Sequence, residues 1–386
     1  MTENEYKVLD LILHNEDITS VELSEKLKVS KVAIFKILEK LEKNNYIEFR
    51  DEVKPVKIGR PRKLMAIKKN RNIIIGVNFG ADFIEISVWN IDRSLIETNI
   101  RHNKSKINDS VLQLIIDGLD SILEKYKEYS VVAVGISLHG IVDSDKKISI
   151  FSPHFKWENY EIGQILEKRY KIPVMIDNDV RSMLNAEIKN GVAIGKKNLL
   201  YIYMKNGIGS SYMINGKIFE GDNNSAGEIG HYIVNYNSKY TCKCGKKGCL
   251  ETEFSENSIK LIIQNEYEEK GLSYNPNINA KKIYDMALDG DEIIVDTVKK
   301  ISYNFGIVIG NILNILDIEN IVISGDILHA KNIFIDSFKL GIEKSLNKKF
   351  QQTYQVYETT FGDDAPKYGA LSLVTNNLFA NLKLIK

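Results

Sequence analysis

The hydrophobic pattern changes near residue 72, and this change constrains the fold more than any other feature of the chain. Before it, apolar residues recur with helical spacing; after it, strand-like runs end in glycine turns and alternate with helical segments. This alternation predicts a largely parallel sheet covered by helices. A similar order returns at 198–219 and at 320–328, which predicts two related lobes. Because ligands of such folds bind at the carboxyl ends of the strands, we expect the site in a cleft between the lobes.

Length and composition indicate a globular protein of more than one domain. The chain has 386 residues, of which 44% are hydrophobic and 27% are charged, and a single core seldom grows to this size. The charged N-terminus and the absence of a long apolar run predict a cytoplasmic protein with no membrane partner. The net charge of +1 means that any surface for nucleic acid must be local.

The first seventy residues have the pattern of a helix-turn-helix. Apolar spacing predicts helices over 5–13 and 20–27 and, after a short break, a third helix over 31–41 that Ser30 caps. A tight turn followed by short and cationic residues is typical of a helix that lies in the major groove of DNA. The residues expected to face the groove are Lys31, Val32, Ala33 and Lys36.

A basic segment follows these helices. A short alternating strand at 46–49 leads into residues 54–69, which hold seven lysines and arginines and no acid. The sequence Gly-Arg-Pro-Arg at 59–62 is typical of the tip of a wing, where arginines reach phosphates or a narrow minor groove. We therefore expect Arg60, Arg62 and Lys63 to contact DNA. A helical hairpin that mediates dimerisation, or a basic loop that is merely solvated, is the alternative interpretation.

The three cysteines of the chain are clustered. Cys242, Cys244 and Cys249 lie within eight positions of one another, and no other cysteine is present. This clustering argues against a disulfide framework and predicts a metal site.

The glycine and cysteine motifs of the body occur in a specific combination. Gly-Glu-Ile-Gly-His at 227–231 precedes Cys-Lys-Cys-Gly-Lys-Lys-Gly-Cys-Leu-Glu at 242–251, and further matches lie at 176–187, 206–221 and 310–325. Together they closely resemble the signature of the ROK family (repressors, open reading frames and kinases), most of all the xylose-repressor and NagC-type branch. The resemblance covers essentially the whole chain.

The resemblance implies both a fold class and a division into domains. The expected fold is α/β, with a winged helix-turn-helix before a two-lobed, actin-like or ribonuclease H-like body of the sugar-kinase type. The DNA-binding domain would span 1–70. The first lobe would span 71–191, with a C-terminal helix at 371–386 packed against it, and the second lobe, which carries the metal site, 192–370.

The resemblance also implies a metal and a sugar site. One imidazole and three thiolates suit a tetrahedral, structural zinc ion with no open position, and the implied ligands are His231, Cys242, Cys244 and Cys249. The implied sugar-binding residues are His154, Asn178, Asp179, Glu228, His231 and Glu251. Carboxylates and amides in a dry cleft distinguish hydroxyl positions, because an unpaired buried polar group is costly. Taken alone, Asn178-Asp179 favours an ordinary helix cap, and only the resemblance favours a part in sugar binding. His154, where many members carry asparagine, and Arg181 argue against glucose.

The turns that hold a nucleotide in the family's kinases are altered in this chain. In place of Asp-x-Gly-Gly-Thr, residues 78–82 are Asn-Phe-Gly-Ala-Asp, which removes one carboxylate and adds another where phosphate oxygens would lie. Residues 207–211, usually a run of glycines, are Gly-Ile-Gly-Ser-Ser, and residues 324–326 are Ser-Gly-Asp. Asp179 matches the general base of the family's kinases, but hydrogen bonding to a sugar also explains it. We therefore expect no enzyme and no catalytic residue.

Together these features predict a repressor of carbohydrate-utilisation genes. Its affinity for double-stranded operator DNA would change when a free sugar, with xylose as the first candidate, binds between the lobes. A symmetric operator predicts a homodimer or homotetramer. Two alternatives stay open: an ATP-dependent, glucokinase-like sugar kinase, and a regulator that binds another protein, such as a sugar-transport component.

Overall fold

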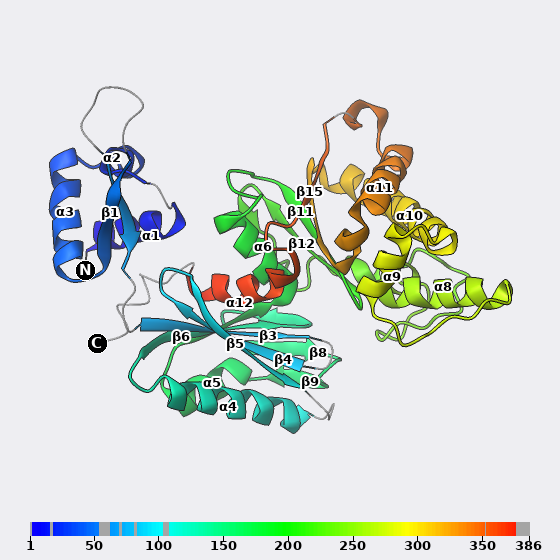
Figure 1. Ribbon diagram of the computed structural model, residues 1–386, viewed down its shortest axis with the longest axis horizontal. Helices are drawn as coiled ribbons and strands as arrows, with labels where there is room; N and C mark the ends of the chain where they lie inside the picture. Colours follow the sequence, from blue (N-terminus) through cyan, green and yellow to red (C-terminus); the bar gives the residue numbers. More distant parts are fainter. Residues whose placement is uncertain are drawn as a thin grey trace. The chain divides into compact units, whose positions relative to one another are not determined.

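A computed structural model describes residues 2–15, 18–53, 62–68, 72–80, 83–102, 108–351 and 353–375 of the chain (Figure 1). These residues divide into two compact units, which span 1–177 with 370–386 and 178–369. None of the described helices is both long and apolar enough to cross a membrane. The three domain boundaries expected from the sequence stay predictions.

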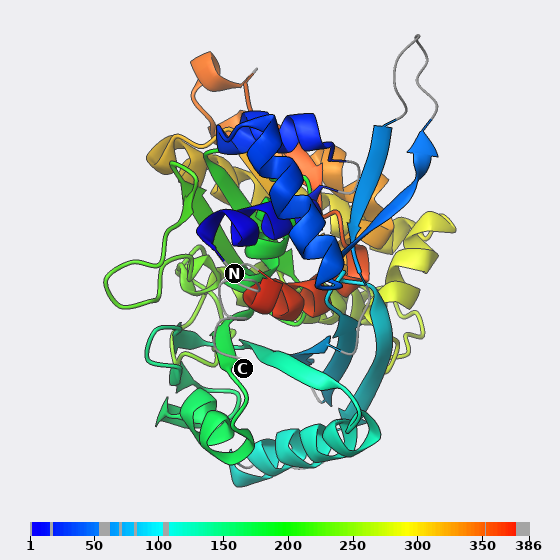
Figure 2. The ribbon, with the colours of Figure 1, turned by 90° about the vertical axis from the view of Figure 1, so that its left-hand side faces the viewer.

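The N-terminal domain is a winged helix-turn-helix. Its helices are α1 (Glu3–His14), α2 (Ser20–Leu27) and α3 (Lys31–Lys43), and its antiparallel hairpin pairs β1 (Ile47–Val53) with β2 (Arg62–Ile67). Figure 2 shows the two strands side by side next to the helices. Lys28 closes the turn between α2 and α3 in the left-handed conformation, with φ of 53°. The predicted helix-turn-helix is therefore confirmed, while residues 54–61 of the expected wing lie outside the described residues.

Two of these elements are longer than the sequence pattern predicted. A capping box formed by Thr2 and Glu5 starts α1 two residues earlier than expected, because each side chain accepts the other's backbone N–H. β1 continues to Val53, beyond the predicted 46–49, because pairing with β2 extends as far as Arg62. Apolar alternation had marked only the half-buried start of the strand.

The first unit also contains a five-stranded sheet with the order β10-β6-β3-β4-β5. Its strands are β3 (Asn72–Phe79), β4 (Phe83–Asn90), β5 (Leu95–His102), β6 (Ser130–Leu138) and β10 (Val174–Asn178). Figure 1 shows α4 (Asn108–Lys125) and α5 (Ile162–Tyr170) on one face of this sheet and α12 (Ala365–Thr375) on the other. A small sheet of β7 (Ile141–Asp143), β8 (Ile148–Ser152) and β9 (Trp157–Tyr160) completes the lobe.

Two glycines let the C-terminal segment lie against this sheet. A Cβ added to Gly135 would stand 2.2 Å from the carbonyl oxygen of Ala370, and one added to Gly76 would stand 3.3 Å from Ala370 Cβ. Residues 370–375 of α12 therefore pack closely on β3 and β6. Residues 376–386, the remainder of the helix expected at 371–386, lie outside the described residues.

The second unit repeats the strand arrangement of the first. Its sheet has the order β13-β12-β11-β14-β15 and contains β11 (Leu199–Met204), β12 (Ile208–Ile214), β13 (Lys217–Ile218), β14 (Asn320–Gly325) and β15 (Gln355–Glu358). In both sheets an antiparallel hairpin stands beside a parallel neighbour. The two related lobes predicted from the sequence are thus present. The prediction of a largely parallel sheet was wrong. Both sheets are mixed, because short hairpins join β3 to β4, β4 to β5 and β11 to β12 in antiparallel pairs.

The helices of the second unit are α6 (Asp179–Asn190), α7 (Leu250–Phe254), α8 (Glu256–Glu269), α9 (Ala280–Leu288), α10 (Glu292–Leu316) and α11 (Lys331–Ser345). Of these, α7 to α11 contribute to its larger core, whereas α6 packs in a smaller one. α10 and α11 approach closely at Gly306 and Gly341, whose added Cβ atoms would stand 2.1 Å and 2.0 Å from backbone carbonyl oxygens of the facing helix. The rings of Phe305, Phe334 and Phe338 stack beside this contact.

A buried carboxylate fixes α6 to the chain beyond β15. Glu187 is fully buried, and its two oxygens accept hydrogen bonds from Thr359 Oγ1 at 2.6 Å, Thr360 N at 2.7 Å, Thr360 Oγ1 at 2.8 Å and Val192 N at 2.9 Å. Such a charge is tolerated in an interior only when several donors satisfy it. These bonds therefore hold α6, which begins at Asp179, against a segment far away in the sequence.

We expect Glu187→Ala to lower the free energy of unfolding by about 3 kcal/mol or more, because it leaves several buried donors without an acceptor. Glu358→Ala is the matched control: it removes a half-exposed carboxylate nearby that pairs with Lys331 and should cost no more than about 1 kcal/mol. Urea denaturation and thermal melting of both variants measure the difference. Equal stability of the two would contradict the anchoring role of Glu187.

Candidate functional site

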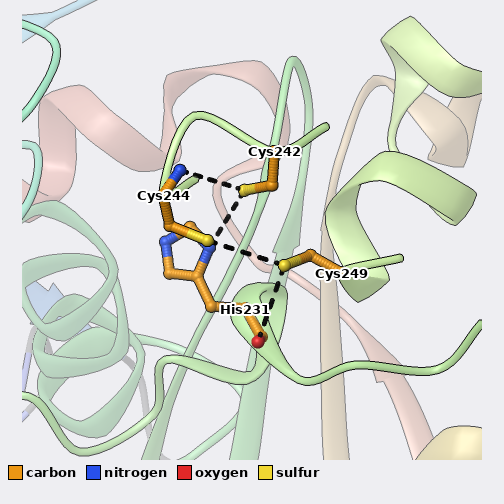
Figure 3. Close-up of side chains that lie close together, drawn as sticks. All are labelled: His231, Cys242, Cys244 and Cys249. Carbon is orange, nitrogen blue, oxygen red and sulfur yellow. Dashed lines mark hydrogen bonds between the residues drawn. The ribbon is translucent and has the colours of Figure 1, made fainter. Parts of the chain in front are cut away.

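His231 and the three cysteines meet in the second unit (Figure 3). His231 ends the short 3-10 helix η1 (Ile229–His231), Cys249 is the N-cap of α7, and Cys242 and Cys244 lie in a tight turn. His231 Nδ1 lies 3.4 Å from Cys242 Sγ, and Cys244 Sγ lies 3.6 Å from Cys249 Sγ. One ligand atom from each residue lies within 4.8 Å of the others. The structure thus brings together all four residues that the sequence implicated in metal binding.

The spacing of these atoms fits a tetrahedral metal ion. Metal–sulfur bonds of about 2.3 Å separate the sulfurs of such a site by about 3.8 Å, close to the distances found here. Cys242 and Cys249 are buried, and burial raises the pKa of both thiols. A cation between them would favour the thiolates instead. The four residues could therefore hold one metal ion with no coordination position left open.

Acidic side chains surround the histidine of this cluster. Glu228 Oε2 lies 3.6 Å from His231 Nε2, and Glu251 Oε1 lies 3.6 Å from His231 Nδ1. Glu251 Oε1 also accepts a hydrogen bond from Cys242 Sγ at 2.7 Å. Burial raises the pKa of Glu228, and the charges of Asp179 and Glu251 raise it further, while His231 lowers it. Four of the expected sugar-binding residues, Asp179, Glu228, His231 and Glu251, are therefore close enough to interact.

Glycines bring the segments of this site together. Gly227 has φ of +94°, and a Cβ added to it would stand 2.3 Å from Ser210 O. A Cβ added to Gly230 would stand 2.1 Å from Ile208 O, and one added to Gly207 would stand 2.8 Å from Glu251 Oε2. Residues 207–211, which match the second phosphate turn of the family's kinases, therefore pack directly on the segment that carries Glu228 and His231.

Asn178 and Asp179 lie at the start of α6, where a strand ends and a helix begins. Asn178 Oδ1 accepts hydrogen bonds from Val180 N and Arg181 N, both at 3.0 Å, and Asp179 Oδ1 accepts from Val180 N at 3.0 Å. The helix-cap interpretation of Asn178 is thus correct. The cap uses the amide oxygen of Asn178. A part for Asn178 in sugar binding stays a prediction.

His154 belongs to the first unit, in the turn between β8 and β9. Its ring lies 5.1 Å from that of Phe155 and 5.9 Å from that of His139, measured between centroids. Phe79 and Trp157 extend this aromatic group. The expected participation of His154 in the sugar site stays a prediction.

The turns that the resemblance relates to a nucleotide site hold one carboxylate, Asp326, among their described residues. Asn78 is buried, and its Oδ1 has no hydrogen-bond partner among the described residues; Ala81 and Asp82 lie outside them. At the end of β14, the carboxylate of Asp326 lies 3.7 Å from Lys205 Nζ. Burial, with the nearby charge of Asp326, raises the pKa of Glu256 to about 8.

Sequence reasoning missed Glu256 and the burial of Arg181. Glu256 is 3% exposed and starts α8, whose buried face also carries Ser258, Ile259, Ile263 and Tyr267. An acid at the start of a helix is common, so the sequence gave no signal that this one is buried. The Arg181 side chain is also buried, 3.6 Å from Glu220 Oε2 and 3.5 Å from Asn224 O. It thus supplies a positive charge among the acids around Glu228.

The residues expected to bind DNA are only partly described. Lys31, Val32 and Lys36 are exposed on α3, while Ala33 is half-buried and its N–H donates to the capping Ser30 Oγ. Arg60 lies outside the described residues, as do the side chains of Arg62 and Lys63, whose backbone forms the start of β2. α3 therefore presents cations to solvent. Contact of any of these residues with DNA stays a prediction.

Comparison with known proteins assigns the family. The model described as ROK family matches residues 74–377. The chain belongs to the ROK family. A second model, described as MarR family, matches residues 1–54, in agreement with the winged helix observed there.

Individual relatives of this ROK protein include both repressors and kinases. The xylose repressor of Bacillus subtilis is 24% identical over 97% of this chain and 95% of its own length. The glucokinase of Halalkalibacterium halodurans is 28% identical over 78% of this chain and 94% of its own length. The crystal structure of a ROK family transcriptional regulator, a homolog of the E. coli MLC protein, has a TM-score of 0.82 and 24% identity, over 99% of this chain and 97% of that one.

We expect purified protein to contain one divalent metal ion per chain, and Cys244→Ser to lose most of it because one of four ligands is removed. Lys243→Ser is the matched control, since it changes the neighbouring side chain of the same turn. Elemental analysis by mass spectrometry measures the metal, and chelation should lower the melting temperature of the control but hardly that of Cys244→Ser. Full metal content in Cys244→Ser would exclude this ligand set.

Proposed function

We propose that this ROK protein is a sugar-responsive, DNA-binding transcriptional repressor of carbohydrate-utilisation genes. One observation carries the proposal: a single chain joins a winged helix to a ROK body. The α3 helix of the winged helix presents Lys31 and Lys36 to solvent, and the body holds a group of carboxylates beside four residues that could bind a metal ion. Repressor relatives match nearly the whole chain, whereas the glucokinase covers 78% of it. DNA binding by the winged helix explains the part of the chain that a kinase does not need.

The effector that best fits the body is an uncharged sugar. Asp179, Glu228 and Glu251 offer acceptors, and His231 offers a donor, so the group can satisfy several hydroxyls of one ring. Carboxylates would repel a phosphate or a sugar acid at neutral pH. We propose the residues expected from the sequence as the sugar ligands: His154, Asn178, Asp179, Glu228, His231 and Glu251. Xylose is the first candidate, because the relatives include xylose repressors.

We propose zinc as the metal and a structural role for it. A set of three thiolates and one imidazole suits zinc, and four protein ligands leave no position for a substrate. The ion would tie the 242–249 turn to η1 and to the start of α7, and so hold Glu228 and Glu251 in place. Zinc would thereby affect sugar binding without touching the sugar.

A kinase is the second candidate. The glucokinase relative favours it, as does the family resemblance, which implies that Asp179 matches the kinases' general base. Against it stands the carboxylate of Asp326 in the turn at 324–326, where added negative charge disfavours phosphate. We propose that the protein does not phosphorylate its sugar. Asp179 would instead accept a hydrogen bond from a sugar hydroxyl.

Sugar and DNA binding are coupled in this proposal. A sugar that binds one arrangement of the two lobes more tightly shifts the protein toward that arrangement. A coupling free energy of about 1 to 3 kcal/mol changes operator affinity by about 5 to 150 fold. A homodimer or homotetramer in the cytoplasm would present its winged helices in pairs to a symmetric operator.

Titration with a panel of free monosaccharides tests the effector. We expect one sugar, with xylose tested first, to raise the melting temperature, because a ligand that binds only the folded state stabilises it. Magnesium-ATP should add no further shift and no sugar phosphate should form. Asp179→Asn should abolish the sugar shift, whereas Asp222→Asn, which changes an exposed carboxylate of the same unit, should keep it. Formation of sugar phosphate would overturn the repressor in favour of the kinase.

The salt dependence of DNA binding tests the winged helix. Each lysine that contacts phosphate contributes about 0.9 to the slope of log affinity against log salt concentration. We expect Lys31→Ala and Lys36→Ala each to weaken DNA binding and to reduce this slope, as measured by fluorescence anisotropy on a duplex selected with the whole protein. Lys127→Ala, a change of an exposed lysine on the body, is the control. An unchanged slope in both α3 variants would exclude phosphate contacts by these lysines.

A further inference from the structure

Two large apolar side chains on α3 face solvent. Val32 is 67% exposed and Phe35 is 57% exposed, although the opposite face of the same helix buries Ile34 and Leu38 almost completely. Elsewhere in the described part of the N-terminal domain, only Val21 on α2, at 42%, is a comparably exposed large apolar residue. The exposed part of a phenyl ring contributes nothing to the stability of the domain itself. The outer face of α3 therefore has apolar surface available for a partner.

The chemistry around these side chains favours DNA as that partner. Val32 and Phe35 are three residues apart, so they lie on one face of the helix. Lys31 and Lys36 stand next to them in the sequence, and both side chains are exposed. The first turn of α3 has no acid, and Ser30 caps it. An apolar patch bordered by exposed cations suits the major groove, where negatively charged phosphate backbones flank base edges that include apolar methyl groups.

Thymine is the base that matches an apolar side chain in this groove. Among the four bases, only thymine presents a methyl group to the major groove, and phenylalanine and other apolar side chains contact it. Three residues of helix advance by about 4.5 Å, whereas successive base pairs are about 3.4 Å apart. The two side chains would thus meet the same or adjacent base pairs.

We propose that Val32 and Phe35 contact thymine C5-methyl groups at neighbouring base pairs of the operator, and thereby select for thymine at those positions. This inference rests on the proposed DNA binding by α3 and names the base chemistry that the helix recognises. Contact of the same face with α3 of a second copy is less favourable, because it would bring four lysine charges together.

Uracil substitution isolates the methyl group. A duplex selected from random DNA with the full-length protein is remade with uracil in place of thymine, one position at a time, which removes the methyl group and keeps base pairing. We expect one or two positions in each half-site to weaken binding by about fourfold each, the factor that corresponds to burying one methyl-sized group. Other thymines should tolerate the change.

Variants assign each sensitive position to a side chain. Phe35→Ala should bind the thymine duplex more weakly and lose its sensitivity to uracil at one position, and Val32→Ala should do the same at the same or an adjacent position. Val21→Ala, the exposed apolar residue on α2, should keep both affinity and sensitivity. Because all three side chains are exposed, unchanged melting temperatures will show that the variants are folded.

The outcomes separate this inference from the proposed function. If the protein selects no DNA, DNA binding itself fails. If it selects DNA that binds equally well with uracil throughout, or if Phe35→Ala keeps the full pattern of uracil sensitivity, the thymine contact is overturned while the repressor stands. If Phe35→Ala changes the sedimentation of the free protein and leaves DNA affinity unchanged, the face joins two copies of the chain and the inference is wrong.

Discussion

Close packing between the 227–230 backbone and the carbonyl groups of β12 is the contact on which the rest of the site depends. Gly227 and Gly230 lie so near to Ser210 O and Ile208 O that neither position has room for a side chain. This contact sets η1 on the sheet, and η1 in turn directs Glu228 and His231. Because His231 also meets the three cysteines, one short helix joins the metal cluster to the acids of the expected sugar site.

The distribution of charge distinguishes the ligands that this body suits. Carboxylates gather in two places: around His231, and around the 324–326 turn with Glu256. Arg181 and Lys205 lie near these acids, and each forms an ion pair with a carboxylate of the protein. Cations already paired in this way neutralise the protein's own acids. This distribution of charge supports the proposal of an uncharged, hydroxyl-rich ligand over a nucleotide.

The winged helix depends on a different constraint: one face of α3 is buried and the opposite face is exposed. Its inner face is held by Ile34, Leu38 and Leu41 in the small core of the domain, so the orientation of the helix is fixed. Its outer face is consequently also fixed, with apolar and cationic side chains toward solvent. A rigid helix loses little conformational entropy on binding, which favours specific recognition.

The sequence by itself determined the features that local patterns encode. Helical spacing and the cap at Ser30 predicted the helix-turn-helix. The cysteine spacing and the 227–231 motif predicted the four residues that lie close enough to hold a metal ion. Both predictions depend on residues close together in the chain or on a family signature. Tertiary structure decided strand direction, the burial of Glu256 and Arg181, and the bonds of Glu187 to Thr359 and Thr360. It also decided that Phe35 faces outward. All of these features depend on contacts between segments far apart in the sequence. The periodicity of apolar residues shows which residues share a face of an element, but not which other segment packs on that face.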